Sequence, residues 1–406
     1  MPKTLREFYE LMEHTAEVRR RLVLQYLKEG TAEAADVEAL KEALDRLQEV
    51  PCVGEGRRSL VLEGERSLEV DLGYEVGELI KDILFFEKGE DEFYTYLERL
   101  HPGFSEEVER GVQFLEGKAF RNFVTDRDGT VNNYCGRYRS SIQSCYNAVF
   151  LSRFIQKCTE HSVVITSAPL KDPGVVTVSV MPPKTFIYAA SKAREFIDEE
   201  GQRRTFPVDA QAQSLLDELN GRLSALVKKP GREKFTLIGS GLQFKFGETT
   251  LARQDISGAV TEEESLAFFE EVKGEVQAVD PNMESFYVGD TGLDIEIVLK
   301  KGGEDDSEAE GQKEFDKGDG LLFLDKELGL KLEQGPTLVC GDTGSDLKLV
   351  EAGVGKNEDT WTVFVTRDAA LIEKVRAVGK ETHIVPEPDV LVCMLDRLSR
   401  KGETHE

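Results

Sequence analysis

Apolar residues follow two different patterns along the chain, and the change between them comes near residue 120. Up to about residue 115 they recur at helical spacing with charged residues between them, which predicts amphipathic helices. Gly30 is expected to end the first helix, and further helices are predicted at 31–50, 77–86 and 91–100. Two short apolar runs at 60–62 and 68–70 fit either strands or loop. The apolar positions of the first helix are Leu5, Phe8, Leu11, Met12, Val18, Leu22, Leu24 and Leu27.

From residue 121 onwards, short apolar runs alternate with amphipathic stretches. Such alternation favours an α/β fold in which a parallel sheet carries helices on both faces. In such a sheet, ligands bind beyond the carboxyl ends of the strands. The predicted core strands are 122–125, 163–167, 185–190, 337–340 and 362–366, and the predicted core helices are 144–158, 369–378 and 390–398.

The stretch between Ser167 and Lys317, about 150 residues, is too long for a loop and must contain a folded insert. It contains two helical patterns, at 210–227 and 262–278, and strand-like runs at 235–239, 241–246, 286–288 and 293–298. Two helices and about four strands suit a small α+β cap placed over a site. The predicted organisation is therefore an N-terminal mostly helical region (1–117), a doubly wound core in two parts (118–200 and 313–406) and an inserted cap (201–312).

Composition narrows the class of protein. The 406 residues carry a formal net charge of -26, which disfavours nucleic acid and anionic membranes as partners but leaves room for a local phosphate pocket. Six cysteines without Cys-x-x-Cys spacing argue against a zinc site. The N-terminus does not read as a signal peptide, and no apolar run approaches the ~20 residues that span a bilayer. We therefore expect a cytoplasmic protein with reduced thiols.

The acidic run and the isolated histidines are not predicted to take part in catalysis. The acidic run 302–311 is predicted to be a solvated, mobile loop, with a regulatory or cation-binding role as the lesser alternative. His14 and His101 are isolated and fit surface positions better than metal ligands. The N-terminal helices show no catalytic constellation, so packing or contact with a partner protein is the expected role.

The strongest chemical signal lies at residues 124–130. Asp126 and Asp128 follow an apolar strand, and Gly129 permits the sharp turn after them. Two carboxylates at a strand end form a site for a hard divalent cation such as Mg2+. Calcium loops and surface turns also contain Asp-x-Asp-Gly, so the pair alone does not decide between these readings.

The other motifs change that balance. The sequence Asp126-Arg127-Asp128-Gly129-Thr130 resembles the first motif of the haloacid dehalogenase (HAD) superfamily of phosphotransferases. That superfamily has three further motifs in fixed order, namely a Ser or Thr that closes a strand, a Lys before a helix, and an acidic pair after another strand. The matching residues, in chain order, are Ser167 (with Thr166 as the fallback), Lys317, and Asp342 with Asp346.

The resemblance implies a role for each motif. Asp126 would attack phosphorus and form an aspartyl-phosphate, while Asp128 would act as general acid and then as general base. Ser167 and Lys317 would hold the transferring oxygens. Without the resemblance, Lys317 also fits a surface salt bridge and Ser167 a helix N-cap. The implied Mg2+ ligands are Asp126, the main-chain carbonyl of Asp128, and Asp342, with Asp346 as a ligand through water or as an orienting group.

The position of the insert resembles the branch of the superfamily that holds trehalose-6-phosphate phosphatase, sucrose-phosphatase and mannosyl-phosphoglycerate phosphatase. The trehalose-6-phosphate phosphatases look most similar, through residues 315–318 (Phe-Asp-Lys-Gly) and the cap strand that carries Glu296. Their cap segment Glu-x-Lys is partly kept and ends at Lys245, and their His before an aromatic residue is replaced near Arg253. These three cap residues are candidate substrate contacts. The resemblance covers residues 120–395, and the Ser-Gly-Arg of that family is replaced by Ser-Ala-Pro at 167–169.

The expected function is a Mg2+-dependent phosphatase for a phosphorylated disaccharide or glycoside, with trehalose 6-phosphate as the leading substrate. Three alternatives stay open at this point. They are a phosphatase for another compatible-solute phosphate of the glucosylglycerol or mannosylglycerate type, a phosphosugar mutase of the same superfamily, and a degenerate binding subunit. The intact acidic residues and Lys317 argue against the last. The sequence does not fix the sugar or the oligomeric state.

Overall fold

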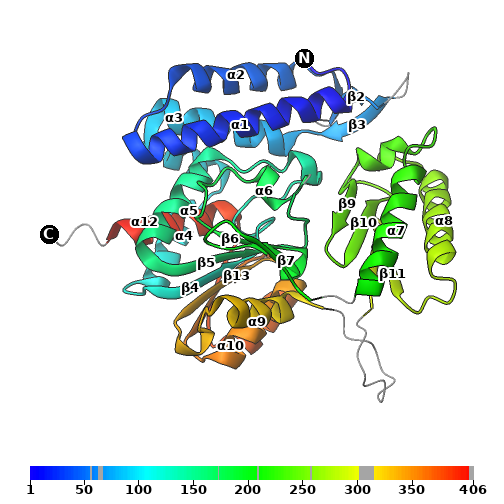
Figure 1. The fold of residues 1–406 in the computed structure, drawn as a ribbon. Coiled ribbons are helices and arrows are strands. Elements are labelled where there is room, and N and C mark those ends of the chain that lie inside the picture. The colour runs from blue at the N-terminus through cyan, green and yellow to red at the C-terminus, as the bar shows by residue number, and fades with distance from the viewer. Residues whose placement is uncertain are drawn as a thin grey trace.

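The computed structural model describes residues 1–54, 57–62, 67–171, 173–207, 210–256, 258–300 and 315–401. The acidic run 302–311 lies outside the described residues. The chain folds into an N-terminal helical region, a sheet covered by helices, and a smaller cap beside that sheet (Figure 1).

The core is an eight-stranded sheet of order β15-β14-β13-β4-β5-β6-β7-β8. Every pair from β15 to β6 is parallel, which confirms the expected α/β core. Strands β7 and β8, at one end of the sheet, each pair antiparallel with the strand before them, and they were not anticipated, because three residues are too few to show a pattern. The strands are β4 (Phe120–Thr125), β5 (Thr159–Ile165), β6 (Ile187–Ala190), β7 (Glu195–Ile197), β8 (Arg203–Thr205), β13 (Thr337–Gly341), β14 (Thr360–Val365) and β15 (Glu381–Val385).

Helices cover both faces of this sheet, as a doubly wound fold requires. Neighbouring residues of β4 show the alternation, because Phe123 packs into one apolar cluster and Val124 into the other. Helices α9 (Lys317–Leu328), α10 (Leu347–Lys356) and α11 (Ala369–Val378) supply the cluster around Val124. The opposite face is covered by α4 (Phe104–Leu115), α5 (Cys145–Cys158) and α12 (Pro388–Lys401).

The N-terminal region lies over this second face (Figure 1). Helix α1 (Leu5–Glu29) begins with a capping box at Thr4 and ends at Gly30, which adopts a left-handed φ of 69°. Helix α2 (Ala34–Gln48) follows, and a small antiparallel sheet then confirms that the apolar runs at 60–62 and 68–70 contribute to strands. Its strands are β1 (Cys52–Gly54), β2 (Arg57–Val61) and β3 (Ser67–Asp71).

Helix α3 (Gly73–Leu100) joins the two segments that the sequence pattern predicts as separate helices. Gly89, with φ 77° and ψ 176°, interrupts the helical backbone between them. The prediction of two helical segments is thus correct, and the two segments follow each other directly with a kink at Gly89.

The cap is a four-stranded antiparallel sheet of order β11-β12-β10-β9, with helices α7 (Ala210–Leu226) and α8 (Glu262–Val279). The predicted strand at 235–239 is wrong, because residues Glu233–Thr236 form a 3-10 turn and Phe235 stacks on Phe268 of α8. The sequence pattern also missed β10, because two of its five residues are threonines and its apolar alternation is therefore weak. The strands are β9 (Leu242–Lys245), β10 (Glu248–Ala252), β11 (Phe286–Asp290) and β12 (Asp294–Leu299).

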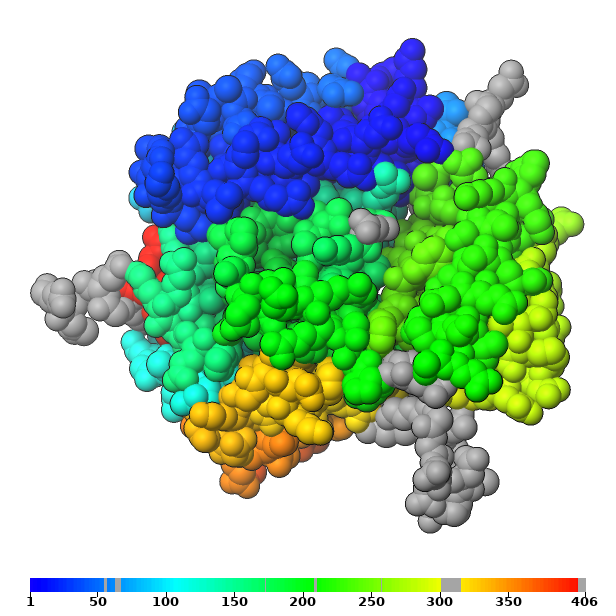
Figure 2. Space-filling view, in the orientation of Figure 1, coloured from blue at the N-terminus to red at the C-terminus, as the bar shows by residue number. Residues whose placement is uncertain are grey.

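The three parts touch one another. Figure 2 shows the N-terminal helices packed against both the core and the cap. The hydroxyl of Tyr9 on α1 donates to the carbonyl of Leu237 in the cap at 2.6 Å. Where helices are described, none is long and apolar enough to cross a membrane. The domain boundaries at residues 117, 200 and 312 stay a prediction.

Candidate active site

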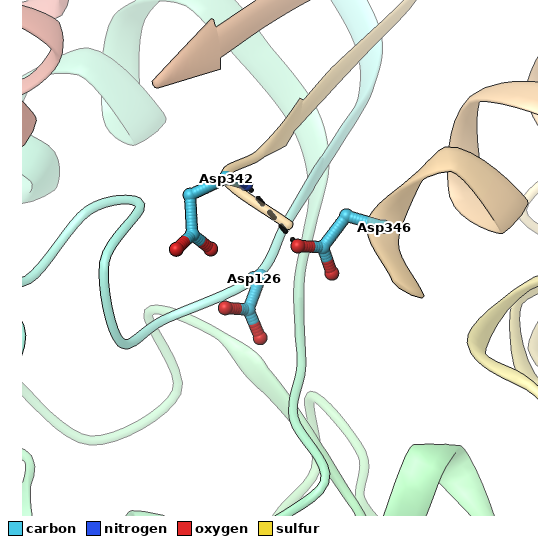
Figure 3. A group of neighbouring side chains, drawn as sticks. All are labelled: Asp126, Asp342 and Asp346. Atoms are coloured by element: carbon cyan, nitrogen blue, oxygen red, sulfur yellow. Dashed lines mark hydrogen bonds between the residues drawn. The ribbon is translucent and has the colours of Figure 1, made fainter. Parts of the chain in front are cut away.

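Asp126 and Asp342 follow neighbouring strands of the core sheet. Strands β4 and β13 are parallel, with Thr125 opposite Cys340, so the chain emerges from both at the same edge. The Asp126 amide donates to the Cys340 carbonyl at 3.1 Å, which extends the pairing into the site. Figure 3 shows Asp126, Asp342 and Asp346 with their carboxylates turned toward a common point. One oxygen from each lies within 4.8 Å of the others.

The turn after Asp126 is shaped by Gly129, whose φ is 87°. Its amide donates to the carbonyl of Asn132 at 2.7 Å and closes the turn. A Cβ atom at position 129 would lie 2.1 Å from Oδ2 of Asp342, so no larger residue fits without displacing that carboxylate. The next residue, Thr130, donates its hydroxyl to Oδ1 of Asp342 at 2.9 Å.

Asp346 lies at the end of the 3-10 turn Gly344–Asp346 and is fully buried. Its Oδ2 accepts from the amides of Asp342 (3.1 Å) and Thr343 (2.9 Å), and from the Thr343 hydroxyl (2.9 Å). The side chain packs over Gly341, where a Cβ atom would lie 2.4 Å from the Cβ of Asp346. Asp346 therefore fixes the loop that carries Asp342.

Lys317 is the first residue of α9 and reaches into the same cluster. Its Nζ lies 2.6 Å from Oδ1 of Asp126 and 2.6 Å from Oδ1 of Asp346. The side chain is only 5 % exposed, so the reading as a surface salt bridge does not apply. Asp316 caps the helix by accepting from the amide of Asp319, which fixes the position from which Lys317 starts.

The charges in the cluster do not balance. Burial raises the pKa of Asp126 to about 7, and the Asp346 charge adds to this while Lys317 opposes it. Burial also raises the pKa of Asp342 to about 8, with Asp126 and Asp346 adding to the rise. The pKa of Asp346 is lowered, because Lys317 and the two backbone amides outweigh the effect of burial. A further positive charge beside Lys317 would lower the pKa of both Asp126 and Asp342.

A divalent cation fits this cluster. Carboxylate oxygens are the ligands that Mg2+ prefers, and the oxygens of Asp126 and Asp342 face a shared space. Both oxygens of Asp346 already accept hydrogen bonds, from Lys317 on one side and from the Thr343 segment on the other. Of the two roles considered for Asp346, this geometry supports the orienting one, with any contact to a metal made through water.

Asp128 points to a different set of partners. Its Oδ1 accepts from the hydroxyl of Ser141 at 2.8 Å and from the guanidinium of Arg127. Arg127 is itself buried and also bonds the carbonyl of Ser141 at 2.5 Å. The Asp128 carboxylate is therefore held from one side, with its side chain 21 % exposed.

The loop after β5 holds the second motif. Strand β5 lies beside β4, so Thr166 and Ser167 emerge at the same edge as Asp126. The hydroxyl of Thr166 accepts from the Ala168 amide at 3.1 Å and so serves the local turn. Ser167 is half-buried, and it caps no helix, because the next helix, α6 (Val175–Val178), begins eight residues later. This arrangement favours Ser167 over Thr166 as the group that faces a ligand.

Two of the three predicted cap residues share one face of the cap sheet. Lys245 is paired with Glu248 and Glu296 with Thr250, two residues further along the same strand β10. Side chains two apart on a strand lie on the same side, so Lys245 and Glu296 both face away from the buried residues Leu251 and Ile295.

Lys245 already has a buried partner. Its Nζ lies 2.7 Å from Oε1 of Glu248, and Lys192 of the core approaches the same carboxylate at 3.7 Å. Lys245 also lines a cavity of about 460 Å³ between β9 and the core loop at 169–171, and none of the motif aspartates lines it.

The guanidinium of Arg253 is bound by other residues of the cap. Its guanidinium bonds Asp290 at 2.7 Å and the hydroxyl of Ser265 at 2.7 Å, both within the cap. The side chain is nearly buried. These contacts tie β10 to β11 and α8, and they leave the predicted role of Arg253 in substrate binding without geometric support.

Several residues of the site were not anticipated from the sequence. They are Thr130, which orients Asp342, the buried Arg127, and Ser141, which bonds Asp128. Arg127 and Thr130 lie inside the first motif, but the direction of their side chains follows from tertiary packing. Ser141 follows a polar run at 132–139, and the sequence of that run does not show where its side chains point.

The fold and this cluster define a HAD-type phosphotransferase, with a mixed, mostly parallel sheet, an inserted cap, and four motifs at one sheet edge. Two family models then match the chain, "Trehalose-6-phosphate phosphatase, C-terminal" over residues 123–391 and "Trehalose-6-phosphate phosphatase N-terminal helical bundle domain" over residues 4–103. The chain therefore belongs to the trehalose-6-phosphate phosphatase family. The second match also covers the N-terminal helices, which the motif resemblance did not reach.

Curated relatives fall into two groups. The chain is 32% identical over 416 residues to alpha,alpha-trehalose-phosphate synthase (UDP-forming) 2 of Aphelenchoides avenae, which covers 96% of this chain and 31% of that protein. It is 29% identical over 439 residues to the trehalose-phosphatase of Brugia malayi, which covers 98% of this chain and 86% of that protein. The chain thus spans about a third of the length of the synthases and most of the length of the phosphatase.

Solved structures that align with the chain include two trehalose-6-phosphate phosphatases. The Aspergillus fumigatus trehalose-6-phosphate phosphatase in crystal form 2 aligns with a TM-score of 0.39 and 13% identity, covering 73% of this chain and 97% of that one. The C-terminal domain of the C. albicans trehalose-6-phosphate phosphatase aligns with a TM-score of 0.44 and 13% identity, covering 72% and 96%.

Proposed function

We propose that this chain is a Mg2+-dependent phosphatase that hydrolyses trehalose 6-phosphate through an aspartyl-phosphate on Asp126. The observation that carries the proposal is the placement of Lys317, whose Nζ lies 2.6 Å from both Asp126 and Asp346. A buried ammonium beside the nucleophile supplies positive charge where the transferring oxygens would sit. Membership of the family and the phosphatase among the relatives support the substrate.

The first half-reaction transfers the phosphoryl group to the enzyme. An oxygen of Asp126 forms a bond to phosphorus as the bond from phosphorus to the sugar oxygen breaks. The departing sugar oxygen takes the electron pair of that bond together with a proton from Asp128. Ser167 and Lys317 hold the phosphoryl oxygens during the transfer.

The second half-reaction releases phosphate. The Asp128 carboxylate takes a proton from a water molecule as the water oxygen bonds to phosphorus, and the bond between phosphorus and Asp126 breaks. Asp126 and Asp342, with the carbonyl of Asp128, would hold Mg2+, which supplies charge neutralisation for the phosphoryl oxygens. Thr130 and Asp346 keep Asp342 oriented in both steps.

The cap is proposed to read the sugar. Lys245 and Glu296 lie on the face of the cap sheet opposite its helices, together with Gln243, Thr250 and Asp294. Such side chains donate to and accept from sugar hydroxyls. Arg253 is not part of this proposal, because its guanidinium is taken by Asp290 and Ser265.

A panel of phosphorylated sugars, assayed by phosphate release, tests the proposal. Trehalose 6-phosphate should be hydrolysed with the highest kcat/KM in Mg2+ and without a bisphosphorylated activator, which separates a phosphatase from a mutase. EDTA should abolish the activity and added Mg2+ restore it, and Asp342→Ala should need far more metal. Asp126→Asn should fold and lose several orders of magnitude in turnover.

Two results would overturn the assignment. Activity of Asp126→Asn within tenfold of the parent would remove Asp126 as the nucleophile, and full activity in EDTA would remove the metal site. A preference for a glucosylglycerol- or mannosylglycerate-type phosphate would instead keep the chemistry and change the substrate.

A further inference from the structure

One face of helix α3 is charged and yet buried. Glu75 and Asp82 are 0 % exposed, and Glu78 and Lys81 are each 4 % exposed. Positions 75, 78 and 82 are spaced three and four residues apart, so they lie on one stripe of the helix. A stripe that packs against a core is normally apolar. The charges on this one therefore need a reason.

The stripe binds the segment 132–145, which follows the first motif. The Glu75 carboxylate accepts from the hydroxyl of Ser140 at 2.6 Å and from Arg137 at 3.1 Å. Glu78 accepts from the side-chain amide of Asn133 at 3.0 Å. Asp82 accepts from the backbone amide of Cys145 at 2.6 Å. Helix α3 thus holds this segment at several points along its length.

Tyr74, at the start of the same helix, adds two contacts nearer the motif. Its hydroxyl donates to the carbonyl of Ile142 at 2.9 Å. The side-chain amide of Asn132 donates to the same hydroxyl at 3.0 Å. Asn132 in turn accepts from the Gly129 amide at 2.7 Å, within the turn that carries Asp128.

The opposite side of the segment touches the site. Ser141 stands between Ser140 and Ile142, both of which α3 holds, and its hydroxyl donates to Oδ1 of Asp128 at 2.8 Å. Arg127 binds the Ser141 carbonyl at 2.5 Å and the Asp128 carboxylate as well. Helix α3 therefore holds the residues on either side of Ser141, and Ser141 itself bonds the proposed general acid.

Packing of helix α3 against the core does not by itself explain why this face is charged. Burying charges requires desolvation, and a well-packed apolar stripe would hold the helix at least as firmly. Directional hydrogen bonds do what apolar contacts cannot, since they fix the rotation and position of each residue that they bind.

We infer that α3 of the N-terminal region positions the Asp128 carboxylate for proton transfer, with Tyr74 and Glu75 acting on the segment 132–145 and Ser141 acting on Asp128. These three are positioning residues. The inference rests on the proposed function, in which Asp128 protonates the leaving oxygen. It assigns the N-terminal helices a part in the chemistry of a site to which they contribute no reacting group.

Leaving groups of different basicity test the inference. A sugar oxygen needs a proton to depart, whereas p-nitrophenolate departs without one, so only the first substrate depends on the placement of Asp128. The quantity to compare is kcat/KM, which covers the steps through formation of the aspartyl-phosphate and excludes its hydrolysis. Tyr74→Phe should lower kcat/KM for trehalose 6-phosphate roughly 3- to 10-fold and leave that for p-nitrophenyl phosphate within about twofold.

Ser141 provides a graded series. Ser141→Ala should lower kcat/KM for the sugar phosphate roughly 10- to 100-fold, because it removes a hydrogen bond to a charged group. Ser141→Cys, which keeps a weak donor, should fall between the parent and the Ala variant. Tyr26→Phe is the matched control, since Tyr26 on α1 donates its hydroxyl to Glu90 at 3.1 Å, away from the segment 132–145. Tyr26→Phe should leave kcat/KM unchanged for both substrates.

Equal losses on the two substrates would show that Tyr74 and Ser141 only support the fold, and no loss on either would show that Asp128 is placed without them. Both results would overturn the inference. Tyr74→Phe decides the matter if Ser141→Ala does not fold. A parent chain that hydrolyses p-nitrophenyl phosphate but no sugar phosphate would refute the proposed substrate, and glycerol 2-phosphate, another alkyl phosphate, would then serve in the comparison.

Discussion

Gly129 and Asp342 are in direct contact across the site, since a Cβ atom at position 129 would lie 2.1 Å from the Asp342 carboxylate. The two residues belong to the first and the fourth motif, in the loops that follow the adjacent strands β4 and β13. The glycine is therefore required twice, for its left-handed φ of 87° and for the space that Asp342 occupies.

Gly129→Ala should lower kcat by about 100-fold or more by moving Asp342, and should destabilise the fold by about 1–2 kcal/mol through backbone strain. Steady-state kinetics and Mg2+ titration calorimetry measure the first effect, and denaturant unfolding the second. Gly355→Ala is the matched control, because Gly355 lies in α10 with nothing within 4 Å of a Cβ atom. Parent-like activity and Mg2+ affinity in Gly129→Ala would show that Asp342 is not needed where it stands.

The raised pKa of Asp126 predicts a pH-dependent stability in the absence of metal. The ordinary pKa is 3.8 and the folded one about 7, so the folded state binds this proton more tightly than the unfolded one. The contribution of Asp126 to stability is then fully present below about pH 3.8 and is lost as the pH rises to about 7. Asn does not ionise, so Asp126→Asn should gain stability relative to the parent across that window, by up to about 4 kcal/mol.

Urea unfolding of parent and variant in EDTA at pH 5 and pH 7.5 measures this difference. Mg2+ should reverse it, because the cation stabilises the ionised carboxylate of the parent only. If the variant instead loses stability relative to the parent as the pH rises, then Lys317 outweighs burial and the charge balance described for the site is wrong.

The position of a motif residue in the fold could be predicted where a strong apolar strand comes directly before it. Asp126 and Asp342 could be placed at one edge because parallel strands end together. The direction of each side chain depends on contacts made much later in the chain. The family resemblance implies that Asp346 binds the metal through water or acts as an orienting group, and its oxygens accept hydrogen bonds from Lys317 and from two backbone amides. Arg253 reads as a ligand contact and is bound by Asp290, 37 residues away.

The fold was predicted less evenly. Strong amphipathic stretches predicted most of the helices and core strands. Strands β1, β7, β8 and β10 are short or rich in polar residues and were missed, and α10 and β15 were not predicted either. Helix α3 was anticipated as two segments, but nothing in its pattern showed that Glu75, Glu78 and Asp82 are buried. Charged residues at helical spacing read as a solvated face, and only the tertiary structure shows what covers them.

Glu248 joins the cap to the core, and its ionisation should govern acid stability there. Burial alone would raise its pKa, but Lys245 and Lys192 lower it to about 2. Its contribution to stability is therefore present above pH 4.5 and lost as the pH falls toward about 2. Glu248→Gln should cost about 3 kcal/mol at pH 7, because it leaves Lys245 buried without a partner, and the difference should shrink near pH 3.

Thermal unfolding at pH 7 and pH 3 checks this prediction. Glu270→Gln is the matched control, since Glu270 forms an exposed pair with Lys273 of the same cap, also three residues apart. It should change little at either pH. A loss for Glu248→Gln that is the same at both pH values would mean that its charge does not stabilise the contact.

The last prediction concerns recognition of the sugar by the cap. Lys245 and Glu296 lie on the face of the cap sheet opposite Leu251 and Ile295, and each can exchange a charge-assisted hydrogen bond with a hydroxyl. Such a bond is worth roughly 1.5–3 kcal/mol, so Lys245→Ala and Glu296→Ala should each lower kcat/KM for trehalose 6-phosphate about 10- to 100-fold. The effect on p-nitrophenyl phosphate should be small, because this substrate has no sugar hydroxyls to bind.

Lys273→Ala, on α8, is the control for loss of a lysine from the cap. Lys245→Ala also unpairs Glu248, so Glu296→Ala carries more weight. Equal losses on both substrates would mean that these residues support the fold or the phosphate step, and the cap would not read the sugar through them.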